Sequence, residues 1–359
     1  MDIDIVSVLS CALEKQASDI FIIAGCPVSC KVSNRIVPLE QDGLPEYRLT
    51  PDDTRRCLEQ IYALGKGRDM KPFIQAGDDD FSFSLENLGR FRCNAYFQRG
   101  SMAAVLRVVA FRLPDPRALN IPDAVIDLNL MKKGLVLITG PAGSGKSTTL
   151  ACIIDKINRT RNCHIITIED PIEYLHRHDQ SIVSQREVSH DTDGYLQALR
   201  AALRQAPNVI LLGEMRDYET IATAMTAAET GQLVLSTLHT VGAANTIDRI
   251  IDVFPPNQQQ QIRVQLSMVL QAVVSQQLVP TVDGKLVPAF EIMLANSAIR
   301  NMIRESKVHQ IDNVIASSMG EGMLPMDTDL YSLFSSGKIS RETALLYAAN
   351  ADSLAKRLK

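Results

Sequence analysis

A glycine-rich segment between an apolar run and a helix-compatible run constrains the fold of this chain more than any other feature. It fits the pattern G-x-x-x-x-G-K-[ST], with Gly134–Thr139 before it and Thr148–Asn158 after it. A glycine-rich turn lets backbone N–H groups converge on a polyphosphate, and the new helix adds the positive end of its dipole. We therefore expect a strand, a loop and a helix that bind a nucleoside triphosphate. The loop residues are Gly140, Pro141, Ala142, Gly143, Ser144, Gly145, Lys146, Ser147 and Thr148.

The side chains of this loop favour a nucleoside triphosphate with Mg²⁺ as the ligand. Lys146 can reach the β- and γ-phosphates, and the hydroxyl of Ser147 suits Mg²⁺. Binding alone is not hydrolysis, which also needs a carboxylate that orients water and a group that senses the γ-phosphate.

The rest of the chain divides at a proline-broken segment, Leu113–Arg117. Because 359 residues exceed a comfortable single core, we expect two domains. Before the break, alternating apolar residues from Asp80 to Val109 predict an antiparallel sheet of hairpins. After it, short apolar strands alternate with helix-length segments, which predicts a mostly parallel sheet covered on both faces. The predicted ranges are an α+β N-terminal domain (1–112), a linker (113–118), an α/β nucleotide-binding core (119–297) and a helical C-terminal region (298–359).

Polar residues follow the apolar strands of the predicted parallel sheet. Glu169 and Asp170 end one strand, and Glu214 follows another. In open α/β sheets ligands bind at the carboxyl ends of the strands, so these carboxylates should lie beside the loop. Glu214 is the predicted catalytic carboxylate. Since Gly213 precedes it, the carboxylate that steadies the Mg²⁺ shell through water must come from elsewhere, and Glu169 or Asp170 can supply it; the alternative is that they only cap the next turn.

A histidine and several arginines complete the predicted chemistry. His239 follows the strand Leu233–Leu238, where an imidazole can sense the γ-phosphate, although a lone histidine is also compatible with a structural role. An arginine from outside the loop can raise the rate of phosphoryl transfer about 10³–10⁵-fold. The arginines of the N-terminal hairpins either suit this role or form a solvated face; they are Arg90, Arg92, Arg99 and Arg107. Further candidates in the core are Arg200, Arg204, Arg216 and Arg249.

The bulk composition limits the classes of partner that we expect for this protein. A net charge of −4 and a pI near 5.9 do not favour direct binding of nucleic acid. The seven cysteines are scattered and form no zinc motif. No window of 18 uninterrupted apolar residues and no signal-type start are present, so we expect a cytoplasmic protein that reaches a membrane only through a partner.

Taken together, these motifs resemble those of the type IV pilus retraction ATPase family, within the larger class of secretion ATPases. The resemblance runs essentially end to end, through the loop at Gly140–Thr149, the acidic box Ile166–Glu173, the segment Leu212–Asp217 and the residues from Thr226 to His239. The segment Ala298–Lys307 is similar to the retraction-linked motif of that family, and Gly89–Asn94 resembles the start of its N-terminal hairpin.

The resemblance implies a PAS-like N-terminal domain, a RecA-like ATPase domain and a ring of six identical subunits. It implies that ATP turnover pulls pilin subunits back into the membrane, with the motor docked through an inner-membrane platform protein at the cytoplasmic face. Glu214 would then be the catalytic carboxylate, Glu169 and Asp170 the acidic box and His239 the γ-phosphate reader. Some positions depart from the family pattern, chiefly Gln232 in place of a histidine, and also Asn208, Phe21 and Ala142.

Two other functions are compatible with the same site. One is an ATPase for pilus assembly or for type II or type IV secretion, although assembly relatives usually carry an additional N-terminal domain and a four-cysteine zinc motif. The other is a non-catalytic ring component that binds ATP and modulates another motor, motivated by Gln232 and Asn208.

Overall fold

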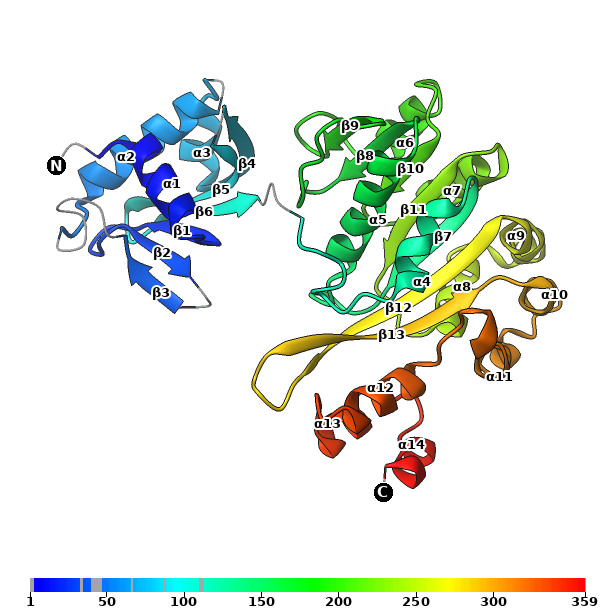
Figure 1. The fold of residues 1–359 in the computed structure, drawn as a ribbon. Coiled ribbons are helices and arrows are strands. Elements are labelled where there is room, and N and C mark those ends of the chain that lie inside the picture. Colours follow the sequence, from blue (N-terminus) through cyan, green and yellow to red (C-terminus); the bar gives the residue numbers. More distant parts are fainter. Residues whose placement is uncertain are drawn as a thin grey trace. The chain divides into compact units, whose positions relative to one another are not determined.

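The computed structural model describes residues 3–32, 35–39, 47–65, 67–86, 88–109 and 113–358. The chain forms two compact units (Figure 1). One comprises Met1–Arg112 with Glu173–Leu175, and the other comprises Leu113–Ile172 with His176–Lys359. Residues 110–112, next to the predicted boundary, lie outside the described ranges. Within those ranges, no helix combines the length and the apolar character needed to cross a bilayer.

The first unit is an antiparallel sheet with helices. Its strands follow the order β3-β2-β1-β6-β5-β4, and the long β4, β5 and β6 are the hairpins that the alternating pattern predicts. Thr50 caps α2 in a reciprocal capping box with Asp53, as the Thr-Pro-Asp-Asp sequence indicates. The elements are α1 (Ile5–Glu14), β1 (Asp19–Ile22), β2 (Ser29–Val32), β3 (Arg35–Pro38), α2 (Pro51–Leu64), α3 (Lys71–Ala76), β4 (Asp78–Leu85), β5 (Gly89–Gln98) and β6 (Ser101–Val109).

The second unit is built on a sheet with the strand order β13-β12-β7-β11-β10-β8-β9. All its pairings are parallel except that of β12 with β13. The predicted mostly parallel sheet is therefore confirmed. The strands are β7 (Gly134–Thr139), β8 (His164–Glu169), β9 (Ile182–Glu187), β10 (Val209–Leu212), β11 (Leu233–Leu238), β12 (Leu270–Pro280) and β13 (Leu286–Leu294).

Apolar side chains cover both faces of this sheet, and β7, β10 and β11 are therefore buried on both sides. One buried cluster joins the sheet to α5 and the turns before β7, and another joins it to the helices from α6 to α11. The helices are α4 (Asp123–Ile126), α5 (Lys146–Thr160), α6 (Tyr195–Ala202), α7 (Tyr218–Glu229), α8 (Ala243–Asp252), α9 (Pro256–Val269), α10 (Ser297–Arg304) and α11 (Ile311–Ser317).

The sequence does not predict the β12–β13 hairpin. Its far end packs against the last helices, where Val279 and Val287 share a buried cluster with Leu330 and Leu354 (Figure 1). The C-terminal region from residue 298 is helical, with a break between α11 and α12 and another at Gly337. These last helices are α12 (Met326–Ser335), α13 (Arg341–Leu346) and α14 (Ala351–Arg357).

Candidate functional site

The predicted site residues of the second unit gather at one edge of its sheet. The strands β7, β11, β10 and β8 are neighbours and run parallel, so their carboxyl ends lie in a row. The loop follows β7, His239 follows β11, Glu214 lies just beyond β10, and Glu169 ends β8. The order of strands thus brings together residues that are up to about a hundred positions apart in the chain, as expected for a parallel α/β sheet.

The loop fits closely against β12, which explains its glycines. Gly140 and Gly145 have φ values of 139° and 87°, which side chains rarely tolerate. A Cβ on Gly140 would lie 2.0 Å from the carbonyl oxygen of Gln276, and one on Gly145 would lie 2.9 Å from Nε2 of the same residue. Gln276 also accepts a hydrogen bond from Thr149 at 2.7 Å. Gln276 is a loop-supporting residue that sequence reasoning missed, because β12 was not predicted.

Lys146 is held inside its own loop. Its Nζ donates to the carbonyl oxygens of Gly140 and Pro141 at 2.8 and 2.9 Å, and the residue is only 8% exposed. Nearby, the hydroxyl of Ser144 is buried and has no hydrogen-bond partner within the described residues. A cradle of backbone, one ammonium group and a spare buried hydroxyl fits a polyphosphate.

Glu214 lies at the centre of the acidic edge. Its carboxylate forms an ion pair with Arg216 and accepts a contact from Nε2 of His239 at 3.4 Å. The carboxylate is largely buried, whereas His239 and Arg216 are mostly exposed. Glu214 and His239 therefore lie together, and Arg216 is placed on the carboxylate itself.

The acidic box lies one strand away. Glu169 Oε1 accepts hydrogen bonds from Thr167 at 2.6 Å and from Gln185 at 3.2 Å. Asp170 is exposed. Hydrogen bonds fix the Glu169 carboxylate, while Asp170 faces water.

These residues fit a Mg²⁺ ion whose ligands are mainly nucleotide phosphates and water molecules. Within the described ranges, no group of three or more His, Cys, Asp or Glu gathers closely enough to hold a metal by itself. Mg²⁺ in nucleotide sites usually keeps several waters and uses few protein ligands, so Ser147 with Glu169 or Asp170 through water suits it.

Two of the four departures from the family pattern, Gln232 and Asn208, lie at the opposite edge of the sheet. Gln232 stands before the first residue of β11, and its side chain accepts a hydrogen bond from Thr230 at 2.9 Å. Asn208 stands before β10 and accepts a hydrogen bond from the backbone of His164 at 2.9 Å. A strand of six residues spans about 20 Å, so Gln232 does not reach the phosphate loop.

The arginines of the first unit differ in how they are paired. Arg92 binds Asp80 with both nitrogens of its fork, and Arg107 pairs with Asp19 at 3.0 Å. Arg90 donates to Ser84 at 3.5 Å. Arg99 stands in the turn between β5 and β6, exposed, and has no ion pair among the described residues.

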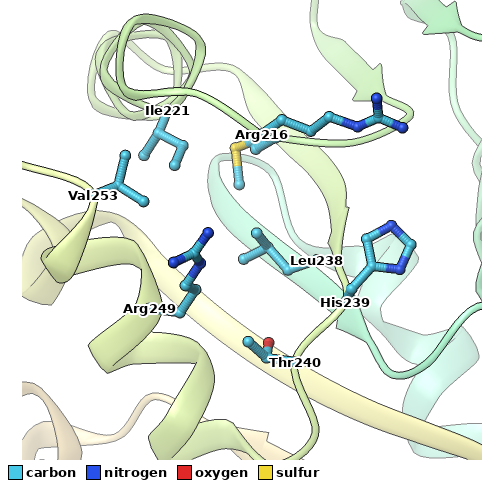
Figure 2. A pocket seen from close by; sticks show the side chains of 8 residues that line it. Arg216, Ile221, Leu238, His239, Thr240, Arg249 and Val253 are labelled. Carbon is cyan, nitrogen blue, oxygen red and sulfur yellow. The ribbon is translucent and has the colours of Figure 1, made fainter.

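The remaining arginine candidates belong to the second unit. Arg200 pairs with Glu219 at 3.4 Å, and Arg204 is exposed. Arg249 of α8 reaches into a pocket of about 460 Å³, while the guanidinium of Arg216 lies on the side of His239 (Figure 2). The pocket adjoins the sheet edge that carries His239 and contains no residue of the phosphate loop. It is lined by Met215, Arg216, Ile221, Leu238, His239, Thr240, Arg249 and Val253.

Comparisons with known proteins show the family of this chain. The family described as "Type II/IV secretion system protein" matches residues 116–316. The chain is 42% identical over 341 residues to the type IV pilus retractation ATPase PilT of Pseudomonas aeruginosa, covering 95% of this chain and 97% of that protein. It is 40% identical over 348 residues to the type IV pilus ATPase PilU of the same organism, covering 97% of this chain and 89% of that protein.

A solved structure extends the similarity to the whole fold. The crystal structure of the pilus retraction motor PilT with bound ADP superposes with a TM-score of 0.88 at 45% identity, covering 99% of this chain and 100% of that one. Sequence and fold therefore agree over nearly the full length of both proteins. The chain belongs to the type IV pilus retraction ATPases, a family of type II/IV secretion ATPases.

Proposed function

We propose that this protein is a motor that hydrolyses ATP to retract type IV pili. The observation that carries the proposal is the end-to-end similarity to a pilus retraction ATPase, combined with the row of catalytic residues along one sheet edge. The similarity includes α10, whose sequence resembles the retraction-linked motif. There Ile299 and Ile303 are buried, and Arg300 donates to the carbonyl oxygens of Ser267 and Met268 at the end of α9.

The residues of the edge divide the chemistry among them. The loop amides and Lys146 bind the β- and γ-phosphates, exchanging the carbonyls that now hold Nζ for phosphate oxygens. When bound near Ser147, Mg²⁺ neutralises charge on the phosphates. Glu214 orients the attacking water and accepts its proton, and His239 contacts the γ-phosphate. For this, Glu214 has to leave its ion pair with Arg216.

The working form in this proposal is a ring of six subunits. An arginine from the first unit of the same or a neighbouring subunit completes the site, and Arg99 suits that role better than Arg92 or Arg107, which are paired with carboxylates. The ring docks on an inner-membrane platform protein of the pilus at the cytoplasmic face and acts on pilin only through that machinery.

Pilus assembly or secretion is the second candidate function. Relatives named type II secretion system protein E match only about a third of this chain, for example 50% identity over 121 residues and 33% of the chain. That relative leaves about two thirds of this chain unmatched, whereas the pilus retraction ATPase matches 95% of it. Retraction is therefore favoured. The third candidate, a non-catalytic ring component, rests on Gln232 and Asn208, which lie at the edge of the sheet away from the loop.

Counting pili on the source cell tests the direction of the motor. Glu214→Gln in the chromosomal gene should give extra surface pili by electron microscopy together with lost surface motility, because pili are built but not withdrawn. A Glu219→Gln strain serves as the control, since Glu219 is an exposed partner of Arg200. Bald Glu214→Gln cells would instead identify an assembly motor, and unchanged pili would reject both pilus functions.

A further inference from the structure

Tyr195 occupies the space that a side chain at position 213 would need. It is the first residue of α6 and packs against the core beside β8 and β10. A Cβ on Gly213 would lie 2.9 Å from the Tyr195 hydroxyl oxygen, closer than carbon atoms normally approach, and 3.3 Å from the carbonyl oxygen of Ile168. The backbone N–H of Gly213 donates to that carbonyl at 2.8 Å. The Tyr195 hydroxyl therefore occupies space that is open because residue 213 is a glycine.

This hydroxyl lies among the acidic groups of the site. The Cβ position on Gly213 is 3.5 Å from Cα of Glu169, and Glu214 is the next residue. Burial, followed by the nearby charges of Glu214, Asp170 and Glu169, raises the pKa of Tyr195. A phenol already keeps its proton at neutral pH, so the group is a hydrogen-bond donor here. Within the described residues it has no hydrogen-bond partner, and it is only half-buried.

We propose that Tyr195 is a positioning residue that replaces the carboxylate missing before Glu214. Its hydroxyl donates to the water that links Glu169 or Asp170 with Glu214 once nucleotide and Mg²⁺ are bound. A hydroxyl orients such a water but adds no negative charge, so the acidic box still has to steady the metal shell. This inference rests on ATP hydrolysis at the site proposed above.

A stability cycle tests the geometry without any activity measurement. Gly213→Ala should lower the Tm by about 3–6 °C, because the new methyl group overlaps the phenol oxygen. In a Tyr195→Phe background the same change should cost less than half as much, because the overlapping oxygen is gone. Equal shifts in the two backgrounds would overturn the proposed fit.

Kinetics of Tyr195→Phe test the role. We expect kcat to fall about tenfold, as for loss of one hydrogen bond, and the Mg²⁺ concentration for half-maximal rate to rise. Affinity for a fluorescent ADP analogue without Mg²⁺ should stay unchanged. Tyr218→Phe is the matched control, since Tyr218 is 40% exposed and packs edge-on against Phe254.

The outcomes separate this inference from the proposed function. An inactive wild-type protein would refute hydrolysis itself. An active wild type with Tyr195→Phe indistinguishable from Tyr218→Phe, in kcat and in Mg²⁺ dependence, would overturn the role of Tyr195 alone. A tenfold fall with weakened binding of the Mg²⁺-free analogue would also contradict it, because the damage would then lie in the nucleotide pocket.

Discussion

At the scale of single residues, Glu214 combines features that suit a general base. It is largely shielded from water, and both of its oxygens have a basic partner, Arg216 and His239. Removal of the charge in Glu214→Gln should lower kcat about 10²–10⁴-fold, the usual contribution of a positioned acid or base. Affinity for ATP should be retained, because the phosphates bind to the loop.

A steady-state ATPase assay with a nucleotide-binding titration checks this prediction. Glu219→Gln, which removes an exposed carboxylate near the same strand end, should behave as wild type. Hydrolysis by Glu214→Gln at the unmutated rate would remove Glu214 from the mechanism.

Asp53 gives a prediction for pH, again at the level of one side chain. Burial alone raises its pKa, but hydrogen bonds from Thr50 and Tyr47 and the pair with Arg56 outweigh burial, so the net pKa lies well below its usual range. The folded state therefore favours the ionised carboxylate of Asp53 over its protonated form. This contribution to stability is complete above the unfolded pKa of 3.8 and is lost as the pH falls toward the folded value.

Urea unfolding between pH 7 and pH 3 checks the sign. Asp53→Asn should be less stable than wild type at pH 7, and the difference should shrink as the pH falls below about 4. Asp52→Asn, at an exposed neighbouring position, should show little effect at any pH. A difference that stays constant down to pH 3 would contradict the assignment.

At the scale of elements, strand β13 contacts both the segment after His239 and the C-terminal helices. Glu291 accepts a hydrogen bond from the backbone of Ala243, the first residue of α8, at 2.7 Å, and the neighbouring Phe290 donates its backbone N–H to Asp329 of α12 at 2.8 Å. The dipole of α8 favours a carboxylate at its N-terminus. Since α8 begins shortly after His239, Glu291 also holds the segment that follows this histidine.

Substitution of Glu291 tests this connection. Glu291→Ala should destabilise the second unit by about 1–3 kcal/mol, because the N–H of Ala243 is left without a partner. Glu291→Gln keeps an acceptor oxygen and removes the buried charge, so its loss should be smaller. Thermal unfolding of both variants measures the difference, and an alanine variant as stable as the glutamine variant would show that this hydrogen bond does not contribute to stability.

At the scale of the whole molecule, the proposed ring of six subunits predicts complementation between damaged subunits. Arg99→Ala lacks the proposed arginine, and Lys146→Ala lacks the phosphate-binding ammonium. If Arg99 completes the site of a neighbour, a mixed ring regains sites with an intact loop from one subunit and an intact arginine from the next. The ATPase rate of the mixture should then exceed the sum of the two variants alone.

Mixing purified variants at different ratios checks this prediction. Arg107→Ala mixed with Lys146→Ala is the control, because Arg107 pairs with Asp19 within its own unit. A rate that never exceeds the sum would mean that Arg99 acts within its own subunit or not at all.

The sequence by itself determined the features that depend on near neighbours. The loop between Gly134–Thr139 and α5, the capped start of α2 and the apolar strands β8 and β11 follow from local patterns, and the structure has them where the patterns predict. Glu169, Glu214 and His239 could be named because a polar residue just after a buried parallel strand has few places to lie.

Only the tertiary structure decided what depends on contacts between distant segments. The β12–β13 hairpin has no periodic pattern that separates it from a buried helix, so Gln276 and Glu291 could not be assigned. The packing of α6 against the core places Tyr195 over Gly213, and this placement is not encoded by local spacing. Packing of elements far apart in the chain selects these contacts, and no short window of sequence carries that information.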